Sequence, residues 1–210
     1  MIKGNRAGTS ARDERYAPMT ERPGGRAALL IIDMINRLDF AGADALRPAA
    51  EAAGERILDL REQASASGVP VIYVNDNHGD WHGDRAVIVE RATGDDSPGR
   101  ELARRLRPRD EDLFVMKPQF SGFYTTTLPA ILPRLGVSRL VLTGVAADIC
   151  VLFTAADAHM REYELWVPAD GVASEDPQRT RWALDTMAKS MGANVRPTSE
   201  RSLGDWLARA

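Results

Sequence analysis

Short apolar runs alternate with longer amphipathic segments from Arg26 onward, and this alternation constrains the fold more than any other feature of the chain. The first run, residues 27–32, is apolar at every position and stops at Asp33. A continuous apolar run of this length is typical of a strand that is buried on both faces. Its alternation with helical segments predicts repeated βα units and a mostly parallel sheet.

The same pattern predicts where each element lies. Strands are expected at 27–32, 69–74, 112–116, 139–143 and 164–167, with an edge strand at 193–195. Helices are expected at 44–66, from the N-cap Ser97 to 107, and at 125–135, 147–161 and 178–191. Residues 75–97 show no firm period and predict a loop that forms a lid. Residues 1–25 predict a mobile N-terminal arm, and residues 26–210 a single domain.

Composition narrows the class of function. Apolar residues make up 44% and charged residues 27% of the 210 positions, as in a globular protein. The net charge is -3 and the basic residues form no block, which excludes the charge pattern of proteins that bind nucleic acid or anionic membranes. No apolar run approaches the ~20 residues of a membrane span, and no secretory signal is evident. We therefore expect a cytoplasmic protein with a small-molecule partner.

Three side chains that carry chemistry lie just beyond predicted strands. Asp33 follows the first strand, Lys117 follows the third, and Cys150, the only cysteine, lies six residues after Gly144. A single cysteine excludes an intrachain disulfide and a cysteine-rich zinc site. Because ligands of open parallel sheets bind outside the carboxyl ends of the strands, the three residues are candidates for one active site.

Each of the three also has an interpretation without function. A thiol in the first turns of a helix has its pKa lowered by the helix dipole and becomes a better nucleophile, but cysteine is also a common packing residue. Lys117, one of only three lysines, would hold a carboxylate or thiolate in its charged form, or would lie in solvent at the strand end. Asp33 would cap a turn or act in a site.

Four segments in order resemble the isochorismatase-like cysteine hydrolases, the superfamily of nicotinamidases and carbamoylsarcosine amidases. They are residues 28–34 (ALLIIDM), 74–77 (VNDN), 117–128 (KPQFSGFYTTTL) and 140–151 (LVLTGVAADICV). The resemblance implies a Rossmann-like αβα sandwich of three layers around a mostly parallel sheet of about six strands. It also implies a homodimer or homotetramer and a catalytic triad of Asp33, Lys117 and Cys150.

The resemblance further implies how the reacting carbonyl is held. The peptide bond after Val145 is expected to be cis, and backbone N–H groups around Val145, Ala146 and Cys150 are expected to bind the oxyanion. The chain departs from the family pattern at Ala147, where many members carry threonine. We expect the fold to tolerate this change.

Several residues near the strand ends are candidates for substrate contacts. The aromatic side chains of Phe40, Trp81, Phe123 and Tyr124, together with Asn77, are predicted to line the pocket, although each aromatic residue could instead lie in the core or at an interface. The hydroxyl groups of Ser121 and Thr126 are predicted to fix their loop by hydrogen bonds.

Asp76, His78 and His82 raise the alternative of a divalent metal, because they supply three donors of the kind that bind zinc. Nicotinamidases use a similar Asp-x-His motif. The context from Asn75 to Trp81, however, looks more like the metal-free branches of the superfamily. We therefore expect no metal and no organic cofactor, with the histidines at the pocket rim and Asp76 capping the loop.

The sequence thus predicts hydrolysis of a C–N bond in a small amide or ureide, through a thioester acyl-enzyme. One alternative keeps the fold and cleaves a vinyl ether, as isochorismatase does without needing a cysteine nucleophile. Another is a non-catalytic protein that binds a small molecule and uses Cys150 as a redox sensor.

Overall fold

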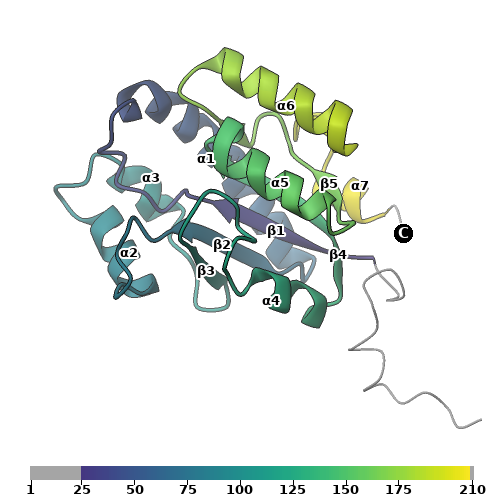
Figure 1. Cartoon of the computed structure of the whole chain (residues 1–210), viewed down its shortest axis with the longest axis horizontal. Helices are drawn as coiled ribbons and strands as arrows, with labels where there is room; N and C mark the ends of the chain where they lie inside the picture. Colours follow the sequence, from purple (N-terminus) through teal and green to yellow (C-terminus); the bar gives the residue numbers. More distant parts are fainter. Residues whose placement is uncertain (1–24, 209–210) are drawn as a thin grey trace, which may run out of the picture.

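A six-stranded sheet forms the centre of the computed structural model, which describes residues 25–208. Its strand order is β3-β2-β1-β4-β5, with β6 also paired to β4, and every pairing between these strands is parallel (Figure 1). The strands are β1 (Arg26–Ile32), β2 (Val71–Asp76), β3 (Leu113–Lys117), β4 (Val137–Val145), β5 (Glu164–Trp166) and β6 (Val172–Ala173). The predicted parallel α/β fold is confirmed. The predicted N-terminal arm, apart from Gly25, lies outside the described residues.

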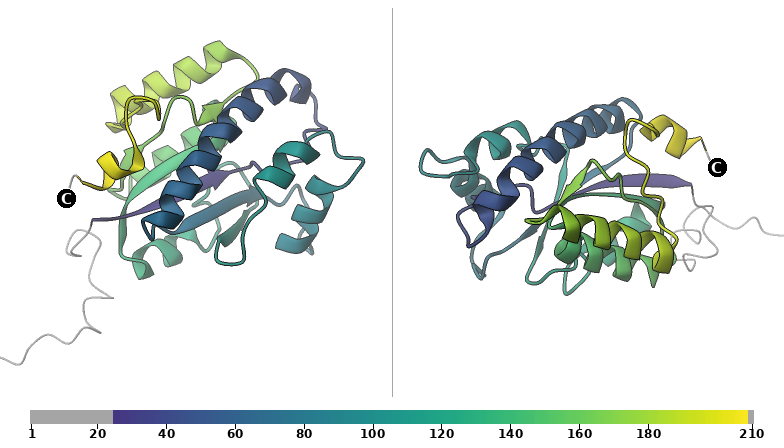
Figure 2. Two further views of the ribbon diagram at one scale, coloured as in Figure 1. Left: turned by 180° about the vertical axis from the view of Figure 1, so that it is seen from behind. Right: turned by 90° about the horizontal axis from the view of Figure 1, so that it is seen from above.

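Two groups of helices cover the two faces of the sheet. The helices are α1 (Ala43–Ala66), α2 (Arg85–Thr93), α3 (Arg100–Arg105), α4 (Leu128–Arg134), α5 (Leu152–His159), α6 (Pro177–Met191) and α7 (Leu203–Leu207). Figure 2 shows α1 crossing one face of the sheet, with α5 and α6 on the opposite face. The arrangement has the three layers that the sequence predicted.

Alternate residues of β1 enter two separate cores. Leu29 and Ile31 pack with α1, α2, α3 and α7, whereas Leu30 and Ile32 pack with α4, α5 and α6. A strand in the middle of the sheet therefore needs apolar side chains on both faces, which explains the unbroken run from Ala27. This burial leaves the first polar side chain, Asp33, at the carboxyl end of the strand.

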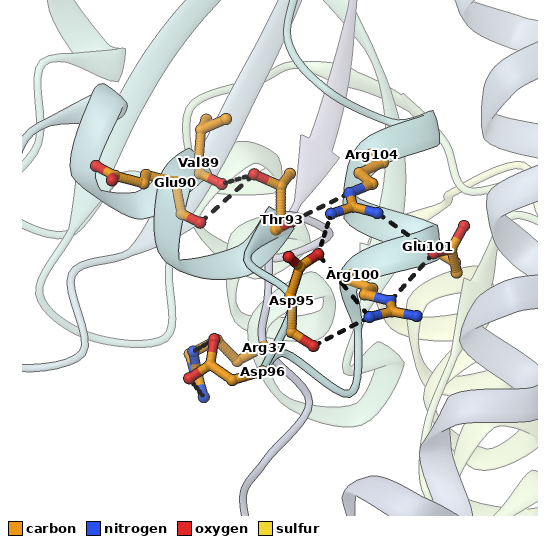
Figure 3. Close-up of polar contacts among 9 residues, drawn as sticks. All are labelled: Arg37, Val89, Glu90, Thr93, Asp95, Asp96, Arg100, Glu101 and Arg104. Carbon is orange, nitrogen blue, oxygen red and sulfur yellow. Dashed lines mark hydrogen bonds and ion pairs between the residues drawn. The ribbon is translucent and has the colours of Figure 1, made fainter.

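Residues 75–97 contain a helix, α2, which the sequence analysis missed by predicting a loop. Its start is marked by Asp84, whose carboxylate accepts hydrogen bonds from the N–H groups of Ala86 and Val87. The segment after α2 is tied to its neighbours by arginines (Figure 3). Arg104 donates to the Thr93 carbonyl at 3.1 Å and to Asp95 at 2.9 Å.

The start of α3 was also predicted wrongly. Its N-cap is Gly99 rather than Ser97, because residues 97–100 form a turn that packs against the loop after β1. The Gly99 N–H donates to the Arg37 carbonyl at 2.7 Å, and a side chain at this position would lie 2.4 Å from the Asn36 carbonyl oxygen. Close contact with the neighbouring backbone thus overrides the local capping signal.

The end of the chain adds smaller differences. The predicted edge strand at 193–195 is a single bridge between Asn194 and Trp166, and neither β6 nor α7 was anticipated. No helix within residues 25–208 is long and apolar enough to cross a bilayer.

Candidate active site

The carboxyl ends of four neighbouring strands, β3, β2, β1 and β4, bring the predicted triad together. Ile32 of β1 is in register with Val74 of β2 and with Gly144 of β4, and Asp76 of β2 is in register with Lys117 of β3. The residues that follow these positions therefore meet at one edge of the sheet. Asp33, Lys117 and Cys150 all lie there, as the sequence analysis predicted.

Lys117 is the centre of the site. Its ammonium nitrogen Nζ lies 2.9 Å from Oδ2 of Asp33 and donates a hydrogen bond to Sγ of Cys150 at 3.5 Å. The Lys117 side chain is fully buried, so it is not the solvated end-of-strand lysine of the alternative interpretation. A buried ammonium needs an anionic partner, and Asp33 supplies one.

Asp33 is held in a conformation that is uncommon for a residue with a side chain. Its φ of 53° lies in the left-handed region, and its N–H donates to the Val74 carbonyl at 2.9 Å. Oδ1 accepts a hydrogen bond from the Asp76 N–H at 2.8 Å, while Oδ2 faces Lys117. Both oxygens of the Asp33 carboxylate therefore have partners, and the side chain is fixed between β2 and β3.

Asp76 is a second carboxylate on the same lysine. Its Oδ2 lies 3.2 Å from Nζ of Lys117, and its Oδ1 accepts a hydrogen bond from the backbone N–H of His78 at 2.7 Å. The sequence analysis assigned Asp76 only to a loop cap or a metal site and missed the contact with Lys117. The available signal was its position, since Asp76 ends the strand next to the one that Asp33 follows.

Cys150 lies in a π-helical turn, Ala147–Val151, that leads directly into α5. The peptide bond between Val145 and Ala146, just before this turn, is cis, as the resemblance implied. The hydroxyl of Thr154 donates to the Cys150 carbonyl at 2.6 Å and accepts the Gly122 N–H at 2.9 Å. Thr154 thus joins the cysteine turn to the loop that follows Lys117.

Burial raises the pKa of the Cys150 thiol, and the Asp33 carboxylate raises it further, while Lys117 works in the opposite direction. The expectation that a helix start would lower this pKa was therefore wrong, because burial and a neighbouring anion outweigh the ammonium. Burial would lower the pKa of Lys117, but Asp33, Cys150 and Asp76 together raise it. The Cys150 thiol and the Lys117 ammonium therefore both have a raised pKa and hold their protons more tightly than in water.

Comparison with known proteins assigns the chain to a family. The isochorismatase domain family matches residues 27–200. This chain belongs to the isochorismatase family. The isochorismatase family protein YaaI of Bacillus subtilis strain 168, described as uncharacterized, is 39% identical over 80% of this chain and 92% of its own length.

Two further relatives of this isochorismatase-family chain carry named activities. The ureidoacrylate amidohydrolase RutB of Serratia proteamaculans strain 568 is 31% identical over 72% of this chain and 71% of its own length. The crystal structure of N-carbamoylsarcosine amidase from Thermoplasma acidophilum is similar with a TM-score of 0.65. It is 33% identical and covers 84% of this chain and 99% of that one.

A cavity of about 220 Å³ lies between the loops after β1 and β2 and helix α2 of this family member. Two of the predicted substrate residues, Phe40 and Asn77, line it, together with Arg37 and His78. No triad side chain is among its lining residues, so the cavity does not enclose the triad.

The other predicted substrate residues are placed differently. Phe123 is 3% exposed and packs in the core with Tyr163, beneath the guanidinium of Arg161. Trp81 and Tyr124 are exposed and do not line the cavity. Phe123 is therefore a packing residue in this structure.

The loop after Lys117 is fixed by the hydroxyl groups that the sequence singled out. Ser121 donates to Asp157 of α5 at 2.5 Å and accepts the Phe123 N–H, and Thr126 donates to the Gly122 carbonyl at 2.5 Å. The predicted structural role of both hydroxyls is confirmed.

The alternative metal ligands do not converge. His78 and His82 are exposed, and within the described part of the chain no group of three or more His, Cys, Asp or Glu side chains is arranged to hold a metal ion. The Asp76 carboxylate already pairs with the Lys117 ammonium and accepts a hydrogen bond from the backbone N–H of His78. These residues do not fit a metal.

Proposed function

We propose that this protein is a cysteine amidohydrolase that cleaves a C–N bond of a small amide or ureide through a thioester acyl-enzyme. The observation that carries the proposal is the position of the Lys117 ammonium, within 2.9 Å of Asp33 and 3.5 Å of the Cys150 sulfur. A nucleophile, a carboxylate base and a cation that stabilises their charged forms are thus in mutual contact. The named activities of the ureidoacrylate amidohydrolase and the N-carbamoylsarcosine amidase support the same chemistry.

The first half-reaction begins with a neutral thiol. Asp33 takes the thiol proton as Sγ attacks the carbonyl carbon, and the backbone N–H groups of Ala146 and Cys150 hold the oxyanion that forms. Lys117 stabilises the thiolate as it develops. Asp33 then returns its proton to the leaving nitrogen, so ammonia or an amine departs and a thioester remains on Cys150.

The second half-reaction restores the enzyme. Asp33 takes a proton from water as the water oxygen attacks the thioester carbon. Collapse of the tetrahedral intermediate releases the carboxylic acid or carbamate, and the proton on Asp33 returns to the Cys150 sulfur. Asp76 keeps a negative charge beside the Lys117 ammonium while Asp33 is protonated, because the Asp76 carboxylate lies 3.2 Å from that ammonium.

The experiment that tests the proposal measures ammonia release from nicotinamide, maleamate, N-carbamoylsarcosine and ureidoacrylate, with and without a chelator. Wild-type protein is compared with Cys150→Ala, and the thioester is sought by mass spectrometry after rapid acid quenching. Ammonia release that is about 10³-fold or more slower in Cys150→Ala than in wild type supports the proposal. Equal release by both proteins would reject it, and release from none of the four would favour vinyl-ether cleavage or a binding role.

A further inference from the structure

The carboxylate of Asp148 is a buried charge that the catalytic steps above do not use. Its side chain is 3% exposed, and it lies in the same π-helical turn as Cys150, two residues earlier in the chain. Oδ1 accepts a hydrogen bond from the Ser174 hydroxyl at 2.6 Å, and Oδ2 pairs with Nε of Arg179 at 2.5 Å. The Asp148 N–H in turn faces the Ser174 hydroxyl oxygen at 3.3 Å.

The partners of Asp148 come from the segment after β6 and from helix α6. Ser174 follows β6, which pairs with the end of β4 through Gly144 and Val145. The Ser174 N–H donates to the hydroxyl of Thr180 at 3.0 Å, and Thr180 and Arg179 both lie on α6. Asp148 therefore connects the cysteine turn to β6 and to α6, whereas Thr154 connects it to the loop after Lys117.

Stability alone does not account for this arrangement. Removing a carboxylate from water costs several kcal/mol, and a buried ion pair contributes less to stability than apolar residues of similar volume commonly do. What a fully hydrogen-bonded buried carboxylate does supply is a single orientation of the backbone that carries it. Here that backbone continues directly to Cys150, whose N–H and Sγ must both face the reacting carbonyl.

We propose that Asp148 is a positioning residue for the nucleophile: with Ser174 and Arg179 it forms a clamp that sets the angle of the Cys150 turn against Asp33 and Lys117. The proposal rests on Cys150 being the nucleophile of the proposed function. It assigns a function to Arg179, whose side chain is 55% exposed and reaches Asp148 from the surface of α6.

The test compares Asp148→Asn, Arg179→Gln and Arg179→Lys with wild type, each confirmed to be folded by circular dichroism. Arg181→Gln is the matched control, because Arg181 is an exposed arginine on the same helix outside the clamp. Steady-state kinetics should give a kcat about tenfold to a hundredfold lower for Asp148→Asn, with KM changed less than threefold. Arg179→Gln should lose part of this rate, and Arg179→Lys should recover much of the loss because it keeps the charge.

A second measurement does not depend on turnover. Iodoacetamide alkylates only Cys150, and its rate at pH 7.5 reports the surroundings of that thiol. Release of the turn should move the half-buried Cys150 away from Asp33 and into solvent, so Asp148→Asn should react several-fold faster than wild type and than Arg181→Gln. This result would stand even if no amide in the panel were hydrolysed, in which case the proposed function alone would fail. A folded Asp148→Asn protein with kcat and alkylation rate both within twofold of wild type would overturn the clamp.

Discussion

Nζ of Lys117 lies 2.9 Å from Oδ2 of Asp33, and the two side chains are 0% and 8% exposed. In so little water each charge depends on its partners within the site: the ammonium on Asp33 and Asp76, and the Asp33 carboxylate on Lys117 and the Asp76 N–H. The Cys150 thiol shares the same ammonium at 3.5 Å. A change to any one of the three groups therefore alters the electrostatic surroundings of the other two.

Asp33→Asn should move turnover and thiol reactivity in opposite directions. Loss of the base should reduce turnover by about 10³-fold or more. Asp33 raises the pKa of Cys150, so removal of its negative charge lowers that pKa and increases the fraction of thiolate at a given pH. Iodoacetamide should then react faster with the variant at pH 8. Slower alkylation of Asp33→Asn would contradict the assigned position of Asp33 beside the thiol.

Lys117→Met should lose stability and thiol reactivity together. The substitution leaves Asp33 and Asp76 facing each other without a cation, and breaking a buried ion pair costs about 3–5 kcal/mol. For a protein of this size, the midpoint of thermal unfolding should fall by about 10 °C. Lys117 lowers the pKa of Cys150, so its loss should also slow alkylation at pH 8. Recovery of part of the stability in the double variant Lys117→Met/Asp33→Asn is the check that the cost comes from the uncompensated charge.

Strand ends are easy to locate, so the sequence pattern marked Asp33, Lys117 and Cys150 as candidates for one site, and the family resemblance implied that they form a triad. The run before Asp33 and the run before Lys117 are both apolar and end abruptly, and parallel strands place their carboxyl ends on one edge. Burial of β1 between two cores makes its sequence pattern unambiguous. The same physical reason explains why the mostly parallel sheet and the layers followed the prediction, although the sequence made no prediction of the strand order.

Features that depend on contacts between distant segments could not be predicted in this way. The contact of Asp76 with Lys117 joins residues 41 positions apart, and nothing in the local pattern distinguishes it from a loop cap. The raised pKa of Cys150 depends on burial by the completed fold. Helix α2 was missed because its apolar positions follow no clear helical period, although Asp84 carried a capping signal.

Asp76→Asn should lower kcat, and neither the wild type nor the variant should depend on a metal ion for activity. The change removes one of the two carboxylates on Lys117, leaving the ammonium without a counter-ion whenever Asp33 carries the proton. Loss of one charged hydrogen bond of ~1.5 kcal/mol corresponds to about a tenfold lower kcat. Turnover of wild type and variant should be equally unaffected by a chelator. Activity of the wild type that a chelator abolishes and added zinc restores would instead make Asp76 a metal ligand.

Gly144→Ala should prevent the site from forming, because β1 and β4 approach each other too closely for a side chain. A methyl group on Gly144 would lie 2.0 Å from the Ile32 carbonyl oxygen, and backbone atoms of a central strand cannot move aside. The φ of 110° at Gly144 adds a conformation that alanine rarely adopts. We expect a loss of more than ~4 kcal/mol and little soluble protein.

Gly68→Ala separates the effect of the backbone angle from that of the contact. Gly68 also has a positive φ, 64°, but an added methyl group there has no atom within 4 Å. Its cost should be only about 1 kcal/mol, measured by chemical denaturation. If the two variants were equally stable, the contact with Ile32 would not be what requires glycine at 144. A large difference would mean that the close approach of β1 and β4 is what requires glycine at 144.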